Sequence, residues 1–287
     1  MLGTSYLEVK MENNKKSFYR VFNSLALLLS CSLALLLPAH AARRVVSLMP
    51  SYTEIIFALG AGPELAGVSS FCNWPPGARE IEKVGDYLRP NLEKIYSLKP
   101  DLVFAGTWQG ATLVRNLREA GVQVIELPQE SSIADIFHTI NRIAVELGRK
   151  KEAAALIKKM KRSLKSRPPG SARPSVYIEV DEGGWTAGGK SFLSDAVEKA
   201  GGKNIFAREP KNYFQASWEA VVKKDPDAVI LVGGSKEGFL KRPLASKLKA
   251  AVKGRIFTGL DRDAFSRPGP RLMGEIEKLK NWFSSNE

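Results

Sequence analysis

The amino-acid sequence predicts an α/β protein of two lobes, each with a mainly parallel central sheet, joined by a single long helix. In both halves of the 287-residue chain, short apolar runs alternate with amphipathic stretches, as in parallel strands connected by helices. Between the halves, residues 149–165 place apolar side chains at three- and four-residue steps among lysines and arginines. Such a helix would be about 25 Å long. By itself this stretch fits an ordinary surface helix of one domain better, so the two-lobe prediction depends on the flanking halves.

The N-terminal 41 residues have the layout of a secretory signal peptide. Lys15, Lys16 and Arg20 precede the apolar run 25–38, and a small-x-small cleavage motif ends at Ala41. The run is shorter than the roughly 20 apolar residues that a helix needs to cross a bilayer. Lipoprotein processing at Cys31 is the alternative, and translation starts at Met1 or at Met11. We therefore expect a periplasmic protein, exported through a cleaved signal peptide.

The net charge and the few cysteines and histidines argue against nucleic-acid binding, a disulfide and a metal site. The formal net charge is +13, and residues 1–41 hold four basic and two acidic residues, so the mature chain keeps +11. The charges are scattered and mixed in sign, which is typical of a solvated surface rather than of a nucleic-acid or membrane contact. The mature chain has one cysteine, Cys72, which we expect to be buried, and one histidine, His138. An internal disulfide and a Cys/His metal site are therefore not expected.

The first half begins with an apolar strand and continues in strand–helix alternation. Ser51-Tyr-Thr-Glu54 is a capping-box pattern that opens a helix ending at Gly60. Asn91 is a suitable N-cap for a short helix. The segment 69–91 has no regular period. The expected elements are strands at 44–48, 65–68, 102–106 and 122–127, and helices at 51–60, 92–98, 111–120 and 133–147.

The second half restarts the same alternation after the long helix. Gly201-Gly202 closes one helix, and Pro270 lies near the first turn of the last one. A glycine-rich loop at 181–190 holds Trp185. We expect strands at 175–180 and 255–260, and a further strand that begins after Asp227. We expect helices at 191–200 and 270–283, and a further helix that begins at Trp218.

A repeated unit relates the two halves. Leu92-Glu93-x-Ile95 followed by Pro100-Asp101 has the same spacing as Trp218-Glu219-x-Val221 followed by Pro226-Asp227, and a strand follows each. A helix–Pro-Asp–strand junction is common in α/β proteins, but residues 51–62 and 191–202 supply a weaker second match in the same order. The repeat therefore favours two related, Rossmann-like lobes. The predicted boundaries are signal peptide 1–41, N-terminal lobe 42–148, linking helix 149–167 and C-terminal lobe 168–287.

Aromatic residues gather in the irregular segments beyond the predicted strand ends. Ligands of open α/β sheets bind beyond the carboxyl ends of the strands. Flat rings on loops suit a large, mainly apolar ligand. For Trp74, Phe214 and Trp218 we favour the alternative, that the ring fills the core of its lobe. The rings for which we favour a cleft are Phe71, Tyr87, Trp185 and Tyr213, and Trp108 also follows a strand.

The segment 261–271 mixes charges, an aromatic ring and prolines directly after an apolar strand. One interpretation is a plain loop that opens the last helix. The other is a cleft edge on which Asp263 and Arg267 contact a ligand. No phosphate-binding loop, zinc motif or nucleophile with a base stands out. A secreted α/β hydrolase is therefore disfavoured.

Six motifs of the mature chain together resemble the periplasmic substrate-binding proteins of metal-chelate ABC importers, with the cobalamin-binding members closest. The resemblance covers nearly the whole mature chain. It implies two α/β lobes joined by one long helix and a corrinoid held between the lobes by aromatic rings. A ferric siderophore or haem is the alternative ligand. The motifs are RVVSLMPSYTEIIFALGAG, GVSSFCNWPP, NLEKIYSLKPDLVFAG, GGKNIF, SWEAVVKKDPDAVIL and SRPGPRL.

Carried over by motif, the resemblance implies a set of ligand-contacting positions. Two of them depart from the cobalamin-binding pattern. An aromatic position after the strand 102–105 is Gly106, with Trp108 as the substitute, and a second expected aromatic is Ala264. A cysteine pair of the cobalamin-binding members is also missing. The implied ligand-contacting residues are Ser51, Phe71, Tyr87, Trp108, Trp185, Tyr213, Asp263, Ala264, Phe265, Ser266 and Arg267.

The resemblance also implies a docking surface. In the family, one glutamate per lobe meets arginines of the permease, and Glu93 and Glu219 stand at those positions. Such charges mainly set orientation and association rate. Without the resemblance we would prefer that each acid stabilises the start of its own helix.

The sequence therefore predicts a binding protein rather than an enzyme. It would capture cobalamin or a related corrinoid and deliver it to the permease dimer of an ABC importer. We expect a monomer with no cofactor, no resident metal and no nucleic-acid partner. Because a continuous helix joins the lobes, we also expect little lobe movement on binding.

Overall fold

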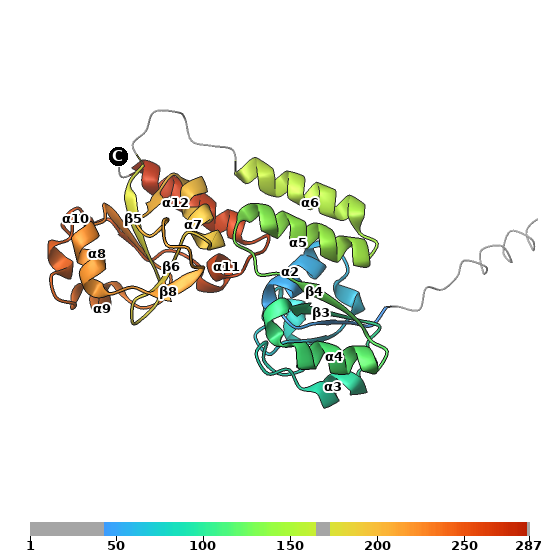
Figure 1. Ribbon diagram of the computed structural model, residues 1–287. Helices are drawn as coiled ribbons and strands as arrows, with labels where there is room; N and C mark the ends of the chain where they lie inside the picture. Colours follow the sequence, from blue (N-terminus) through green and yellow to red (C-terminus); the bar gives the residue numbers. More distant parts are fainter. Residues whose placement is uncertain (1–42, 165–172, 286–287) are drawn as a thin grey trace, which may run out of the picture. The chain divides into compact units, whose positions relative to one another are not determined.

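The computed structural model describes residues 43–164 and 173–285. The predicted signal peptide and Cys31 therefore lie outside the described residues. The first group of elements follows the predicted order with shifts of one or two residues (Figure 1). It comprises β1 Val45–Ser47, α2 Pro50–Ala58, β2 Leu65–Val68, α3 Leu92–Ser97, β3 Leu102–Gly106, α4 Ala111–Glu119, β4 Gln123–Leu127 and α5 Ile133–Glu146.

The first sheet has the order β2-β1-β3-β4, and all its strand pairs are parallel. Successive side chains of a strand point to opposite faces. Val45 and Phe104 accordingly pack with α2 and α5 on one face, while Val46 and Val103 pack with α3 and α4 on the other. Figure 1 shows this arrangement of helices about β3 and β4. The apolar runs of these strands thus reflect burial on both faces.

The second sheet is mixed rather than wholly parallel, with the order β10-β9-β5-β6-β8 and β7 paired to β5. β10, β9 and β5 are parallel, whereas β6 and β8 are antiparallel to their neighbours. The elements of this half are β5 Ser175–Asp181, β6 Trp185–Ala187, α7 Phe192–Ala200, β7 Lys203–Asn204, β8 Tyr213–Gln215, α8 Trp218–Lys224, β9 Ala228–Leu231, α9 Lys236–Leu240, α10 Lys249–Val252, β10 Ile256–Phe257, α11 Arg262–Ser266 and α12 Leu272–Ser285.

Three expectations about local structure need correction. The predicted loop 181–190 contains β6, because Gly183 and Gly184 adopt φ of +91° and +82° and turn the chain back onto β5. The segment 261–271 contains the short helix α11, capped by Asp261, whose side chain accepts from the backbone N–H of Ala264. The capping box of α2 is absent, since Met49 is the N-cap and no side chain caps that helix.

The repeated Pro-Asp unit has the same structural role in both halves. The Asp101 carboxylate accepts a hydrogen bond from the backbone N–H of Arg44, just before β1, at 2.8 Å. The Asp227 carboxylate accepts one from the backbone N–H of Ser175, the first residue of β5, at 3.0 Å. In each half, the aspartate before one strand thereby holds the first residues of the neighbouring parallel strand. The repeat found in the sequence is thus a repeat of structure.

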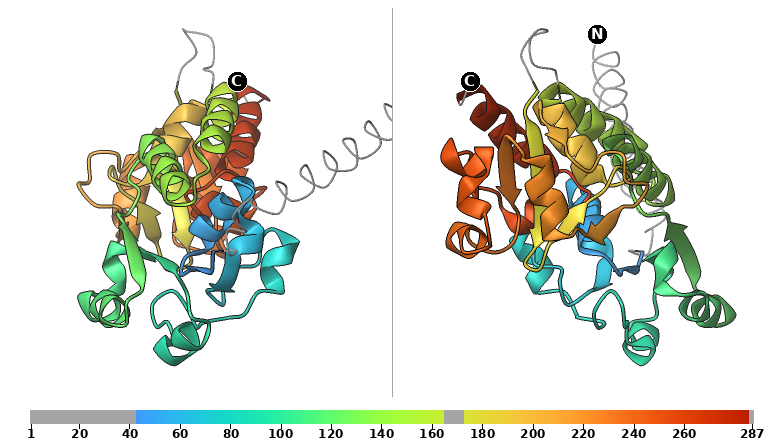
Figure 2. Two further views of the ribbon diagram at one scale, coloured as in Figure 1. Left: turned by 90° about the vertical axis from the view of Figure 1, so that its right-hand side faces the viewer. Right: turned by 60° about the vertical axis from the view of Figure 1, so that its left-hand side comes forward.

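The linking helix is observed as α6, Lys150–Ser163. Its buried side chains, Ala153, Ile157 and Met160, pack in a core that both sheets share. α6 packs against α5 and α12, and α5 in turn contacts α2 and α7. Figure 2 shows α5 and α6 side by side in both views. The connection between the halves is therefore a packed helix pair with a continuous apolar core.

Within the described residues, no helix is long and apolar enough to cross a membrane.

Candidate ligand-binding site

The exposed ring of Phe71 and the half-buried ring of Tyr87 form an aromatic pair beyond β2. Their centroids are 5.5 Å apart with an interplanar angle of 59°. Phe71 is 53 % exposed, which is unusual for a phenylalanine. Two rings at this distance form a favourable tilted contact while leaving ring surface open. The pair thus offers a preformed apolar surface to a ligand.

Trp108 extends the aromatic surface beyond β3. Its ring lies over Gly106, where an added Cβ would come within 2.4–2.6 Å of the ring atoms. The glycine therefore makes room for the tryptophan. That Trp108 replaces the aromatic residue expected at position 106 stays a prediction. The buried Gln109 ties the segment of Trp108 to the segment of Tyr87. Its side chain accepts a hydrogen bond from the Gly106 N–H at 2.7 Å and donates one to the Tyr87 carbonyl oxygen.

In the second half, Trp185 and Tyr213 lie on the β6–β8 ladder. Trp185 begins β6 and is 48 % exposed. Tyr213 begins β8 opposite Ala187 and packs against the shared core. Burial raises the pKa of the Tyr213 phenol to about 12. A hydrogen bond from Ser191 lowers this pKa, and the charge of Glu130 raises it further. Tyr213 is therefore a neutral hydroxyl at physiological pH.

Glu130, between β4 and α5, is a buried carboxyl that the sequence did not single out. It is 4 % exposed and accepts a hydrogen bond from the Thr139 hydroxyl at 2.7 Å. Burial raises its pKa from 4.5 to about 7, although the bond from Thr139 acts in the opposite direction. Its charge also raises the pKa of Tyr52 on α2. Glu130 thus couples electrostatically to tyrosines from both halves.

Glu130→Gln is expected to remove a pH dependence of stability. Because the folded-state pKa lies above the ordinary value of 4.5, the folded protein binds the proton more tightly than the unfolded chain. The wild-type free energy of unfolding should therefore fall, by up to about 3 kcal/mol, as pH rises from about 4.5 to 7, and stay level above. The glutamine variant should have the higher melting temperature at pH 8. Glu119→Gln, which alters an exposed carboxylate, serves as the control, and parallel pH profiles for Glu130→Gln and wild type would contradict the assignment.

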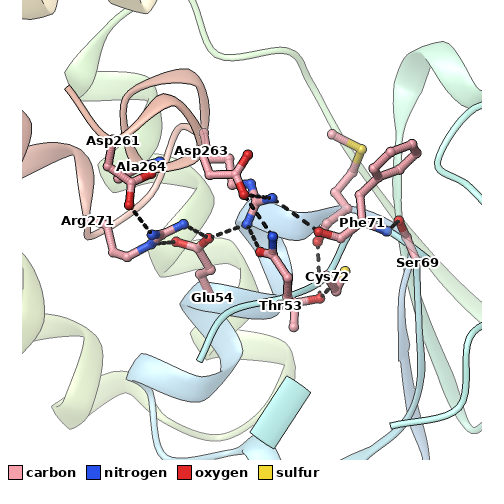
Figure 3. Close-up of polar contacts among 12 residues, drawn as sticks. Thr53, Glu54, Ser69, Phe71, Cys72, Asp261, Asp263, Ala264 and Arg271 are labelled. Carbon is pink, nitrogen blue, oxygen red and sulfur yellow. Dashed lines mark hydrogen bonds and ion pairs between the residues drawn. The ribbon is translucent and has the colours of Figure 1, made fainter. Parts of the chain in front are cut away.

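A buried ion network joins the first group of elements to the segment 261–271 (Figure 3). Glu54 on α2, whose side chain is 3 % exposed, contacts Arg267 at 2.9 Å and Arg271 at 2.8 Å. Arg271 makes a second bond to the same carboxylate at 2.9 Å, and its guanidinium lies 4.9 Å from the Trp74 ring centroid. A carboxylate this deeply buried is tolerable because both oxygens are paired.

The same network holds the loop that carries Phe71. Arg267 donates to the Phe71 carbonyl oxygen at 3.1 Å and to the Asn73 side-chain oxygen at 2.7 Å. Asp263 accepts from the Asn73 side-chain N–H at 2.8 Å and pairs with Arg267 at 2.9 Å. The buried Cys72 thiol lies 3.1 Å from the Thr53 hydroxyl. Asp263 and Arg267 therefore position the aromatic loop.

The remaining predicted contact residues differ in accessibility. Ser51 is 2 % exposed, and its hydroxyl has no hydrogen-bond partner among the described residues. Ala264 and Phe265 are 3 % and 0 % exposed, because they form the buried side of α11. Like Ser51, both side chains are buried, and ligand contact at these three positions stays a prediction. Ser266 is exposed.

Of the three rings that the sequence assigned to the lobe cores, two are in a core and one is exposed. Phe214 packs at 5.3 Å from Phe206, and Trp218 at 5.5 Å from Phe239, so both fill the second core as expected. Trp74 is instead 44 % exposed. Together with Arg271 it borders a groove of about 280 Å³, so the core assignment of Trp74 is wrong. His138 is exposed on α5 and borders a separate groove that contains none of the predicted site residues.

Glu93 and Glu219 occupy equivalent positions in the first turns of α3 and α8. Both are exposed, and neither forms an ion pair within residues 43–164 and 173–285. Asn91 and Ser217 cap the two helices through their side chains. Helix capping therefore does not occupy either glutamate, and both carboxylates are available to a partner.

Sequence reasoning missed Glu54, Asn73, Gln109 and Glu130. Glu54 carried one usable signal, since it is the single charged residue of an otherwise uncharged helix, PSYTEIIFA. An isolated acid on such a helix requires a buried partner. The other three act through backbone atoms or distant side chains, for which the local sequence has no pattern.

The chain is similar to known proteins along most of its length. Residues 45–262 match the family described as periplasmic binding protein. The chain is 34 % identical over 249 residues to a Bacillus subtilis protein named as an ABC transporter substrate-binding lipoprotein, covering 83 % of this chain and 78 % of that one. It is 32 % identical over 263 residues to the vitamin B12-binding protein of Salmonella paratyphi A, covering 88 % and 95 %.

The solved structure of the periplasmic heme-binding protein RhuT from Roseiflexus sp. RS-1 superimposes with a TM-score of 0.75 at 27 % identity, covering 85 % of this chain and 98 % of that one. Two α/β lobes, an aromatic surface at the strand ends and the family match lead to one conclusion. The chain belongs to the periplasmic binding protein family and is a substrate-binding protein of an ABC importer, a transport component without enzymatic activity that works outside the cytoplasm.

Proposed function

We propose that this protein binds cobalamin or a related corrinoid and delivers it to the permease of its importer. The observation that carries the proposal is the preformed surface of Phe71, Tyr87 and Trp108, supplemented by the exposed ring of Trp185. A corrinoid is a large, flat ligand with polar substituents at its edge. Open aromatic rings with few polar groups suit it well.

The electrostatics favour a corrinoid over an anionic ferric siderophore. Arg267 and Arg271 are both engaged with the buried Glu54, so neither guanidinium is free for an anionic chelate. Glu130, near Tyr213, adds negative charge once it ionises near pH 7. A siderophore would depend instead on cations such as the exposed Arg89, two residues after Tyr87.

Haem is the second candidate, supported by the likeness to a heme-binding protein. A haem iron is held by an axial histidine, tyrosine, methionine or cysteine. The single histidine of the mature chain, His138, lies on the separate groove of α5. Tyr87 and Tyr213 are the tyrosines of the candidate site, so haem binding here would depend on a phenol rather than an imidazole as the iron ligand. The titration described next separates the two ligands.

Titration of the mature protein with cyanocobalamin, cobinamide and hemin tests the proposal. We expect tight, saturable quenching of tryptophan fluorescence by a corrinoid. Phe71→Ala with Trp185→Ala should weaken that binding by roughly a hundredfold, since each lost stacking contact contributes about 1.4 kcal/mol or more. Phe214→Leu alters a ring in the core and should leave affinity nearly unchanged. Tight binding of hemin or a ferric siderophore, without a response to either corrinoid, would overturn the ligand assignment.

The route of export belongs to the same proposal. We favour cleavage after Ala41, and lipid attachment at Cys31 is the alternative supported by the lipoprotein name of the Bacillus relative. N-terminal sequencing and mass spectrometry of the exported protein distinguish them. A free N-terminus near Ala42 supports cleavage, and a diacylglyceryl-modified Cys31 supports the anchor.

A further inference from the structure

The outward side of α6 carries a concentration of cations that ligand binding and permease docking do not use. Glu152 is the only acid of the helix. Glu93 and Glu219 lie on α3 and α8, so α6 is not part of the proposed docking surface. The exposed basic side chains of α6 are Lys150, Lys151, Lys158, Lys159, Lys161 and Arg162.

These cations have no acidic partners in the part of the chain that the structure describes. Some other exposed cations of the protein do, as in the pairs Arg115–Glu119 and Arg118–Glu126, and α6 differs by gathering on one helix six cations that are unpaired among the described residues. On α6 the neighbours of Lys158 at three and four residues further on are Lys161 and Arg162. Like charges at this spacing destabilise an isolated helix. The arrangement therefore costs local stability unless an external anion neutralises it.

Three of these cations border a shallow groove. Ala154, Ile157, Lys158, Lys161 and Arg162 line an open space of about 400 Å³. Residues at these spacings share one side of a helix. The groove therefore has a small apolar floor and a cationic rim, which suits a phosphate-bearing headgroup. No large apolar side chain of α6 is exposed, so contact here is electrostatic rather than inserted.

We propose that this basic side of α6 docks reversibly on a membrane surface rich in anionic phospholipid. Charge complementarity supports this partner, and the protein's location outside the cytoplasm places a bilayer within reach. An extended helix side matches a flat lipid surface better than it matches a compact ligand. The proposal revises the interpretation, drawn from sequence alone, that the basic surplus is only a solvated surface. Binding of this kind weakens steeply with salt.

Vesicle flotation tests the proposal. The purified mature protein is mixed with vesicles of phosphatidylcholine alone or with added phosphatidylglycerol, at low and high salt. We expect binding only to the anionic vesicles at low salt. The triple variant Lys158→Glu, Lys161→Glu, Arg162→Glu should lose at least about tenfold in the partition coefficient. Ala154→Lys should strengthen binding.

A matched control separates a local surface from overall charge. Lys236→Glu, Lys241→Glu and Lys247→Glu change the net charge by the same amount on and beside α9, where all three residues are exposed. This variant should bind nearly as well as wild type. Equal losses in both triple variants, or no binding of wild type to anionic vesicles, would overturn the proposal. If the α6 triple variant has a lowered melting temperature, Ala154→Lys decides the question, because unchanged binding of that variant counts against the docking surface.

Discussion

Replacing Glu54 with glutamine is expected to lower the free energy of unfolding by up to about 3–5 kcal/mol, because it removes the buried carboxylate that two largely buried guanidinium groups share and leaves them only the more exposed carboxylates of Asp263 and Asp261. Arg267 and Arg271 are 12 % and 19 % exposed and both contact the Glu54 carboxylate. The melting temperature should fall by about 10 °C in a protein of this size. Thermal unfolding followed by circular dichroism measures the change.

The pair Arg115–Glu119 provides the matched control for this prediction. Its side chains are 65 % and 69 % exposed and 3.9 Å apart. Glu119→Gln should change the free energy of unfolding by less than about 1 kcal/mol, because water screens exposed pairs. A melting temperature for Glu54→Gln equal to that of Glu119→Gln would show that the network adds no net stability. The network also holds the Phe71 carbonyl, so Glu54→Gln should weaken ligand binding as well.

Reversing the charge at both docking positions, Glu93→Arg with Glu219→Arg, is expected to abolish ligand uptake while leaving ligand affinity unchanged. The two carboxylates are exposed, unpaired within the described residues and equivalent in the two halves. Arginines there would repel the permease arginines that the family resemblance implies, and like charges across an interface cost several kcal/mol. Uptake of labelled cobalamin by cells that carry this protein's own importer measures the effect.

Glu152→Arg with Glu277→Arg makes the same change in net charge on α6 and α12, where both residues are exposed. Uptake should persist in that variant, because neither residue belongs to the docking pair. Normal uptake by the Glu93/Glu219 variant would remove the docking role from these residues. Loss of ligand affinity in the same variant would instead indicate a structural defect, which the fluorescence titration detects.

The aromatic residues of the candidate site could be predicted from the sequence, but the polar residues that hold them could not. The positions of Phe71, Tyr87, Trp108 and Trp185 followed from strand ends, since rings beyond the carboxyl edge of a parallel sheet lie near its crevice. The polar framework did not follow. Ser51 and Glu54 match a capping box in the sequence, yet Pro50 begins α2 and Met49 is its N-cap, so Glu54 is free to turn toward two arginines. A sequence motif of a few residues does not show an ion pair with a residue from a distant element.

The charge on α6 illustrates the same limit. Lysines and arginines alternate with apolar residues along this stretch, and counting them shows only an amphipathic helix. The packing of Ala153, Ile157 and Met160 decides which side is buried, and it leaves the six cations on the open side. The absence of acidic partners within the described residues becomes visible only with the neighbouring elements in place.

By itself, the sequence determined the order of strands and helices in the first half, the repeat that relates the two halves and the positions of Glu93 and Glu219. These features depend on the period of apolar residues and on local caps, which involve neighbours in the chain. Only the tertiary structure decided that Arg271 pairs with Glu54, 217 residues away, and that Glu130 is buried beside Thr139. The first contact joins distant elements, and the second depends on how α5 packs over the preceding loop. In both, burial makes an unpaired polar group costly and so selects its partner.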